Sequence, residues 1–283
     1  MTVKNFIPTI WSTRLMANLD KDLVFLNMVN RDYEGEISAF GDTVKINQMG
    51  DVTIKEYTGA DIADPEDLNS EQQTLTIDQA HYFNFRVKDV DKAQANVTLM
   101  DKGMARASYA SADKIDMDIA KLITSADVTQ KVGTVAAPIE ITALNAYDYL
   151  VDLGTQLTTY NVSKVDRKIV LPPWYFGLLS KDARFTKDLN ILRNGVVENS
   201  TVGGFQLLES NNVHQDTTGA DAVFQVMAGT TQGISFANQV LETEAYRPEK
   251  NFADAVKGLV TYGRKIVEPK ALVQFNIKQA PKV

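Results

Sequence analysis

The residue types that most often carry chemistry are scarce in this chain and poorly spaced for it. Only two histidines occur, His81 and His214, and neither has a second histidine or a carboxylate at metal-ligand spacing. Cysteine is absent, which excludes thiolate nucleophiles, disulfides and cysteine-based metal sites. The phosphate-binding glycine patterns are missing, and residues 233–237 lack the second glycine of a G-x-S-x-G elbow. We therefore expect no cofactor, no metal and no catalytic residue.

Carboxylates are plentiful, so their pairing says little about function. Pairs such as Asp113/Asp116 and Glu242/Glu244 could do acid–base work, but solvated helix faces produce such pairs by default. A denser group could bind calcium, yet it lacks the D-x-[DN]-x-[DN]-G spacing of a calcium loop. We interpret it as a charged, flexible tip, made of Asp61, Asp64, Glu66, Asp67 and Glu71.

Composition narrows the class of protein. The 283 residues are 44% hydrophobic and 23% charged, which is typical of one large globular domain or two closely joined ones. The net charge of -7 argues against a protein that recognises nucleic acid through a basic surface. It is compatible with a protein that encloses nucleic acid without binding it tightly. No apolar run is long enough to span a membrane, and the first ten residues do not form a secretory signal. The absence of cysteine fits a reducing cytoplasm.

The first ninety residues predict extended elements. Residues 7–29 carry apolar side chains at helical spacing behind Pro8, which indicates an amphipathic N-terminal arm or, alternatively, a helix packed on its own core. Period-two alternation predicts a long two-stranded ribbon with a mobile tip at 58–71, built from residues 43–47, 52–57, 74–78 and 82–87. Because an isolated ribbon is marginal in water, it must lie on its own domain or on a neighbouring subunit.

The strongest helical signal runs from 90 to 124. A thin apolar stripe predicts one helix of about 50 Å lying across a sheet; two shorter helices broken near Gly103 are the alternative. Its members are Val97, Met100, Met104, Ala107, Ser111, Ile115, Ile119 and Leu122.

Beyond a boundary at 128–138, mixed elements predict an α+β subdomain. We expect helices leading through 141–157 and at 174–181, and strands at 168–171, 205–208, 222–227 and 233–237. Strands at 259–263 and 271–277 should pair around Pro269 and return to the sheet that carries the long helix.

Two stretches resemble the major capsid protein family of tailed bacteriophages. At the N-terminus they are Asn5-Phe6-Ile7-Pro8 with Ile10-Trp11-Ser12, and Val29 to Gly35 leading into Gly41-Asp42-Thr43-Val44. Near the C-terminus they are residues 244–250, 252–258 and 269–272. The order of elements between them is also similar, so the resemblance covers essentially the whole chain.

The resemblance implies the α+β tailed-phage capsid fold with defined parts. These are an N-terminal arm (1–40), an extended β-hairpin loop (41–88), a spine helix of the peripheral subdomain (89–128), an axial subdomain (129–255) and C-terminal strands returning to the peripheral subdomain (256–283). In the family the loop and the arm reach neighbouring subunits. The candidate inter-subunit contacts are therefore Trp11, Lys55, Tyr57, Asp61, Asp64, Glu66, Asp67 and Glu71.

The function implied is structural and not enzymatic: assembly through pentamers and hexamers into an icosahedral virion capsid, in the host cytoplasm. The partners implied are a portal, a separate scaffolding protein (Met1 begins close to the arm) and DNA enclosed without sequence-specific binding. An encapsulin-type compartment is the nearest alternative. An α+β enzyme and a nucleic-acid-binding protein are weaker ones, because the chain lacks a nucleophile–base constellation and a basic balance.

Overall fold

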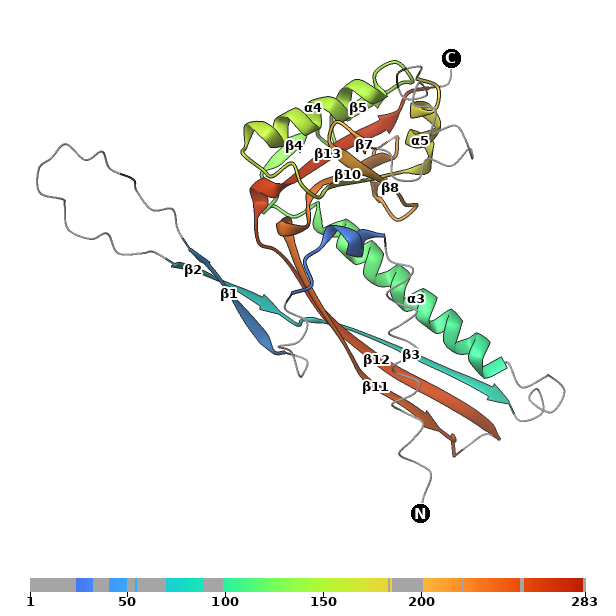
Figure 1. Ribbon diagram of the computed structural model, residues 1–283. Coiled ribbons are helices and arrows are strands. Elements are labelled where there is room, and N and C mark those ends of the chain that lie inside the picture. The colour runs from blue at the N-terminus through green and yellow to red at the C-terminus, as the bar shows by residue number, and fades with distance from the viewer. Residues whose placement is uncertain are drawn as a thin grey trace, which may run out of the picture.

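The computed structural model describes residues 24–32, 41–49, 54, 70–88, 99–182, 184, 201–219, 221–249 and 252–281. These residues form a thick body at one end of the molecule and a long limb at the other, with a narrow ribbon leaving from the point where they meet (Figure 1).

The body is built on an eight-stranded mixed sheet. Its strand order is β4-β13-β10-β6-β8-β7, with β5 paired to β13 and β9 paired to β10. Residues 272–277 of β13 are all buried, so this central strand is covered on both faces. Leu272, Val273, Phe275 and Ile277 supply its apolar contacts, and the buried amides of Gln274 and Asn276 are joined by a hydrogen bond of 3.1 Å. The strands are β4 (Gln130–Val132), β5 (Ile139–Ile141), β6 (Arg167–Leu171), β7 (Thr201–Val202), β8 (Phe205–Glu209), β9 (His214–Asp216), β10 (Val223–Thr230) and β13 (Leu272–Gln279).

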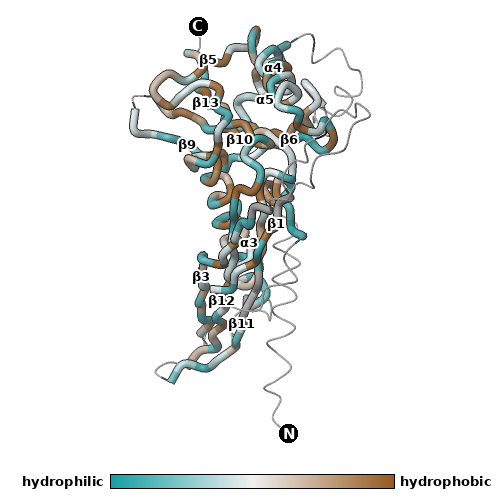
Figure 2. Tube along the Cα trace, turned by 90° about the vertical axis from the view of Figure 1, so that its left-hand side faces the viewer, coloured by the Kyte–Doolittle hydropathy of each residue, from teal (hydrophilic) through white to brown (hydrophobic). Residues whose placement is uncertain are grey.

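Helices α4 (Ala146–Thr159) and α5 (Pro173–Leu179) pack on this sheet. The Tyr149 ring lies 5.9 Å from that of Phe275, and the Trp174 ring lies 5.4 Å from that of Phe224. Hydrophobic residues gather around β6, β10 and β13 (Figure 2). The two helices and the strands expected at 168–171, 205–208 and 222–227 lie near the expected residues. The strand expected at 233–237 is wrong for this subdomain, because it begins β11 (Ile234–Tyr246), which belongs to the three-stranded sheet of the limb.

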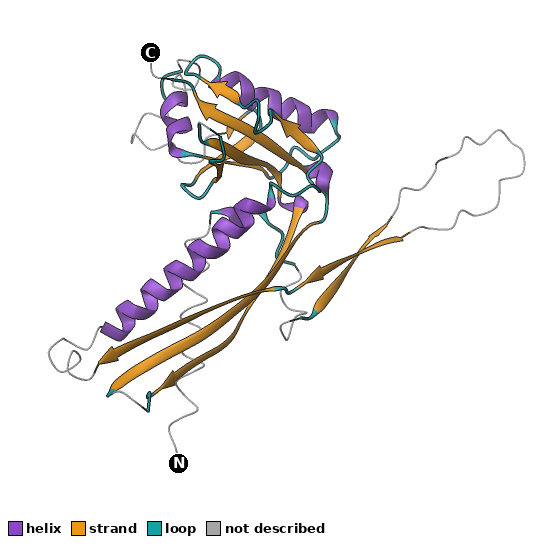
Figure 3. Ribbon diagram, turned by 180° about the vertical axis from the view of Figure 1, so that it is seen from behind, coloured by secondary structure: helices purple, strands orange, loops and turns teal. Residues whose placement is uncertain are grey.

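The limb is a three-stranded sheet with one long helix along it (Figure 3). β12 (Ala253–Ile266) pairs antiparallel with both β11 (Ile234–Tyr246) and β3 (Gln79–Lys88). Helix α3 (Leu99–Leu122) is continuous through Gly103, so the alternative of a break there is wrong. A Cβ at Gly103 would lie 2.6 Å from the Phe85 ring, so glycine lets helix and sheet approach closely.

The ribbon consists of β1 (Thr43–Met49) and β2 (Ser70–Thr76), paired from Thr43↔Thr76 to Met49↔Ser70. The assignment of 82–87 to this ribbon is wrong, because β3 pairs with β12 in the limb. Most of 52–57 lies outside the described residues. At its base the ribbon packs on its own chain in a small buried cluster: Val44, Ile46, Leu75, Ile77, Ala237 and Val267.

The C-terminal strands do not pair with each other as expected. β12 returns to the sheet beside α3, but β13 enters the eight-stranded sheet between β10 and the parallel β4. A one-turn 3-10 helix, η5 (Pro269–Ala271), separates the two strands and redirects the chain. Period-two alternation identifies a strand but does not indicate which strand it pairs with. The expected pairing of β13 was wrong for this reason.

The root of the N-terminal arm is a core element. A short 3-10 helix, η2 (Phe25–Met28), buries Phe25, Leu26 and Met28. The rest of the helix expected at 7–29 lies outside the described residues.

Candidate functional site

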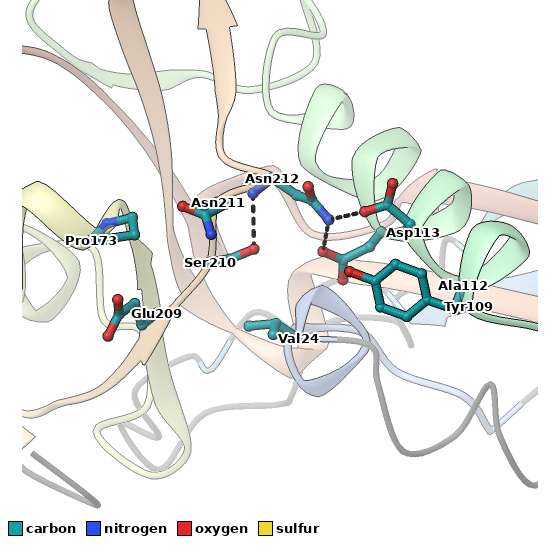
Figure 4. Close-up of a pocket in the computed structure, with 10 residues that line it drawn as sticks. Val24, Tyr109, Ala112, Asp113, Pro173, Glu209, Ser210, Asn211 and Asn212 are labelled. Carbon is teal, nitrogen blue, oxygen red and sulfur yellow. Dashed lines mark hydrogen bonds between the residues drawn. The ribbon is translucent and has the colours of Figure 1, made fainter. Parts of the chain in front are cut away.

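A hollow lies where α3, the arm root and the turn after β8 meet (Figure 4). It measures about 420 Å³ and is lined by Val24, Tyr109, Asp113, Asp116, Pro173 and residues 209–212, among others. It therefore sits between the limb and the body and not inside either one.

Asp116 is the central group of this junction. Its side chain is buried, and its carboxylate accepts hydrogen bonds from the Phe25 backbone N–H at 2.8 Å and from Asn212 Nδ2 at 3.1 Å. Asn212 Nδ2 also donates to Asp113 at 2.7 Å. Burial raises the pKa of Asp116, while the hydrogen bonds from Phe25 and Asn212 oppose that rise. The expectation of a solvated pair at Asp113/Asp116 is wrong for Asp116, which joins three parts of the fold.

A second polar cluster fastens α3 to the limb sheet. The Tyr262 hydroxyl donates to Asp118 and lies 2.9 Å from His81 Nε2. Arg264 Nε donates to the Asp118 backbone carbonyl at 3.2 Å. Burial, followed by the contact with Asp118, raises the pKa of the Tyr262 hydroxyl, so it stays a neutral donor.

The arm root is also tied to both sheets. Lys168 Nζ on β6 donates to the Asn27 carbonyl at 2.8 Å. Asn30 bridges β11, because its N–H donates to the Ile234 carbonyl at 2.7 Å and its carbonyl accepts from the Phe236 N–H at 2.9 Å. The contacts of Asp116, Lys168 and Asn30 thus hold the arm root against α3, the body and the limb.

The hydrogen bonds of these clusters join separate parts of the fold. Asp116 and Asp118 are both engaged in hydrogen bonds, and the hydroxyl that contacts Asp118 belongs to Tyr262, whose raised pKa keeps it protonated. Across the described ranges, no group of three or more His, Asp or Glu residues could hold a metal ion. None of the described helices is both long and apolar enough to cross a membrane.

The candidate contact residues from the sequence are not brought together by any described contact. Seven of the eight lie outside the described residues: Trp11, Lys55, Tyr57, Asp61, Asp64, Glu66 and Asp67. The eighth, Glu71, is placed by its backbone in β2, opposite Gln48. All eight stay predictions.

Sequence reasoning missed Asp116, Asp118 and Tyr262 because their partners lie far away along the chain. Asp116 contacts Phe25 across 91 residues, and Tyr262 contacts Asp118 across 144. One weak signal was present: Asp116 directly follows Ile115 on the buried stripe of α3, where a solvated carboxylate is out of place.

The described architecture can be compared with known proteins. The pattern of one family, described as phage capsid protein, matches residues 71–275, which is well over half of the chain. The chain belongs to the phage capsid protein family. A comparison with curated protein sequences gives no match.

Solved structures give the same fold. A structure from Mycobacterium phage Che8 superposes with a TM-score of 0.71 at 25% identity, covering 97% of this chain and 94% of that one. The capsid of the cyanophage P-SCSP1u gives 0.68 at 15% identity, covering 90% and 87%. A virus-like particle from Pyrococcus furiosus gives 0.58 at 14% identity, covering 95% and 99%.

These matches confirm the expected α+β fold of tailed-phage major capsid proteins. The chain is thus a structural subunit of a phage capsid, and the family is one of shell proteins and not of enzymes.

Proposed function

We propose that this capsid protein assembles through pentamers and hexamers into an icosahedral shell that encloses the double-stranded DNA of a tailed phage. Assembly takes place in the host cytoplasm, with a scaffolding protein and a portal, and the shell holds the DNA without reading its sequence. The observation that carries the proposal is the match of the family to residues 71–275, together with a fold shared with the capsid of cyanophage P-SCSP1u.

The shape of the subunit supports this proposal physically. Within the described residues, α3 covers one face of the three-stranded sheet of the limb, and side chains on the other face are exposed (Figure 3). Tyr82 on that face is 81% exposed, and its cross-strand neighbour Leu259 is only partly covered. An apolar side chain held on a rigid, uncovered sheet suits a contact with another subunit.

The proposal also divides the chain into functional parts. The arm comprises residues 1–40, the extended loop 41–88, the spine helix and its surroundings 89–128, the axial part 129–255 and the C-terminal strands 256–283. In this division the loop, the arm and their residues Trp11, Lys55, Tyr57, Asp61, Asp64, Glu66, Asp67 and Glu71 contact neighbouring subunits. Many modest contacts of this kind become strong collectively once a closed lattice forms.

Electron microscopy of the purified protein, with size-exclusion chromatography of the same sample, tests the proposal. Closed shells, or rings of five and six subunits, are expected. A second sample should lack residues 58–69, which leaves β2 intact, and a third should carry a Gly/Ser segment of equal length in their place. We expect both altered subunits to fold and to assemble poorly; loss of subunit stability with intact assembly would contradict the proposed role of the loop.

A compartment that encloses a cargo protein is the second candidate. It is favoured by the likeness to the Pyrococcus furiosus virus-like particle, which this chain matches over 99% of that protein's length. The contents of shells purified from the natural source distinguish the two functions: nucleic acid supports the phage capsid, and a single packaged enzyme supports the compartment.

A further inference from the structure

The outer face of α3 is basic, although the whole protein has a net charge of -7. Three of the four aspartates of this helix are engaged by other parts of the fold, as described for Asp116 and Asp118. At 3.6 residues per turn, the basic residues fall within an arc of about 120°, opposite the buried stripe through Ile115 and Ile119. All four basic residues are exposed: Lys102, Arg106, Lys114 and Lys121. These four cations are called the basic face below.

The basic face is not neutralised by the rest of the described chain. None of its cations lies within ion-pair distance of a described carboxylate. Asp113 is the one aspartate of α3 in the same arc, and it accepts a hydrogen bond of 2.7 Å from Asn212. Helix α4 of the body gives the contrast, because it contains Asp148 and Asp152 but no lysine or arginine. Positive charge is therefore concentrated on α3.

The side chains around these cations do not form an apolar contact patch. Ala107 and Ala110 lie between the two pairs of cations, so the long basic side chains project beyond their surroundings. Between Lys102 and Lys121, the large apolar side chain within the arc is Met117, which is 41% exposed. Interfaces between proteins usually have an apolar centre within a polar rim. The basic face lacks that centre, so its composition favours a partner that is recognised by charge.

Double-stranded DNA has the complementary surface. Each strand carries a phosphate about every 3.4 Å along the duplex, whatever its sequence. Lys102 and Arg106 are separated by about 6 Å along α3, and the whole basic face spans about 28 Å, at 1.5 Å per residue. Several of its cations can therefore meet phosphates of one duplex without a fixed register. Lysine and arginine form charge-assisted hydrogen bonds with phosphate oxygens.

We propose that the basic face of α3 is the surface through which the shell contacts the phosphates of its enclosed DNA. The proposal rests on the proposed shell function and assigns the DNA contact to particular residues. Each contact is modest and sensitive to salt, and the many copies of α3 in a shell add their contributions. The acidic remainder of the chain limits binding of nucleic acid by the free subunit before assembly.

Charge neutralisation tests the proposal. We compare Lys102→Gln/Arg106→Gln on α3 with Lys131→Gln/Lys164→Gln, a matched control that removes the same charge from exposed residues of the body. Each purified protein is titrated with a short fluorescent DNA duplex over a range of salt concentrations, and fluorescence anisotropy gives the dissociation constant. Circular dichroism melts verify folding. Lys121 is left unchanged because a cation in the last turn favours the helix.

We expect the α3 variant to bind the duplex about tenfold or more weakly at low salt, and its plot of log affinity against log salt to lose a slope of about 0.9 for each cation removed. The control should keep the wild-type slope. An α3 variant that folds and keeps that slope overturns the proposal without affecting the shell function. Tighter binding of wild type to polyglutamate than to the duplex also overturns it, because the partner is then an acidic protein.

Thiol labelling gives an independent readout on assembled shells. Because the chain has no cysteine, Ala110→Cys places a single exposed thiol between the cations of the basic face. A thiol reagent too large to cross the shell wall should label free subunits much more strongly than closed shells. Equal labelling of both overturns the proposal, because the basic face then points away from the enclosed DNA. A wild-type protein that forms no capsomers or shells counts against the proposed function instead.

Discussion

The body and the limb differ in how much of their β-sheets is buried. In the body, β13 and β10 lie at the centre of an eight-stranded sheet and are almost entirely buried. In the limb, three long strands have α3 on one face and leave Tyr82 and Lys257 exposed on the other. The body has the core of a self-sufficient domain, whereas the described part of the chain covers only one face of the limb sheet, and the other face suits another molecule.

The junction at Asp116 shows how the two regions are kept in one geometry. A shell subunit needs its contact surfaces at fixed angles, and a buried hydrogen-bonded group fixes an angle better than apolar contact alone. The arm root is held by Asp116 of α3, by Lys168 of the body, and by the backbone of Ile234 and Phe236 in the limb, which bonds to Asn30. The comparison predicts that core changes in the body harm folding, while changes on the open limb harm assembly.

The largest effect is expected in the body. Replacing Phe275, which is fully buried beside Tyr149, with alanine should lower the free energy of unfolding by about 3–5 kcal/mol, because a cavity forms in the central strand. Denaturant unfolding measures the change. A loss below about 1 kcal/mol, within the range of ordinary surface changes, would mean that the body is not the stabilising core.

The next effect concerns the base of the ribbon. Leu75 is fully buried among Val44, Ile46 and Val267, so Leu75→Ala should cost about 2–3 kcal/mol locally. Hydrogen exchange should show faster opening of β1 and β2, while β10 and β13 keep their protection. Equal loss of protection in both regions would show that the ribbon and the body unfold as one unit.

At the junction, Asp116→Ala should lower the free energy of unfolding by about 1–3 kcal/mol, because it removes the acceptor of the Phe25 N–H and one of the two acceptors of Asn212 Nδ2. Asp113→Ala, which removes one partner of Asn212 from a less buried position, is the control and should cost less. An equal cost at both positions would assign the effect to charge and not to the buried hydrogen bond.

The same site predicts a dependence on pH. Burial raises the folded-state pKa of Asp116 above its ordinary 3.8, so the folded protein holds a proton that the unfolded chain releases. Between 3.8 and the raised value, stability therefore falls as the pH rises. Thermal melts should show wild type gaining on Asp116→Asn as the pH drops from neutral towards 4; a constant difference would contradict the raised pKa.

The sequence predicts those features of the structure that leave a pattern within one short segment of the chain. The apolar residues of 271–277 and the stripe through Ile115 and Ile119 identified β13 and α3, because each signal lies within a single element. The pairing of β3 with β12, or of β13 with β10, produces no pattern within either strand, because a strand with an apolar face can pair with many other strands. The ribbon was expected to span 43–87, but the structure ends it at Thr76.

The polar junction was harder to predict for a related reason. Asp116 and Tyr262 resemble ordinary surface residues until the fold brings Phe25 and Asp118 beside them. The resemblance of the chain ends to capsid proteins supplied the fold class that periodicity alone could not.

The smallest effect on the subunit is expected on the open face of the limb, and it is the sharpest test of the comparison. Tyr82→Ser removes a side chain that is 81% exposed, so the free energy of unfolding should change by no more than about 0.5 kcal/mol. If this face contacts another subunit, the same change removes a buried aromatic ring from that interface and raises the concentration needed for assembly. Tyr160→Ser, at a half-exposed position on the body, is the matched control. A Tyr82→Ser protein that assembles like the control would mean that this face of the limb sheet makes no contact with another subunit in the shell.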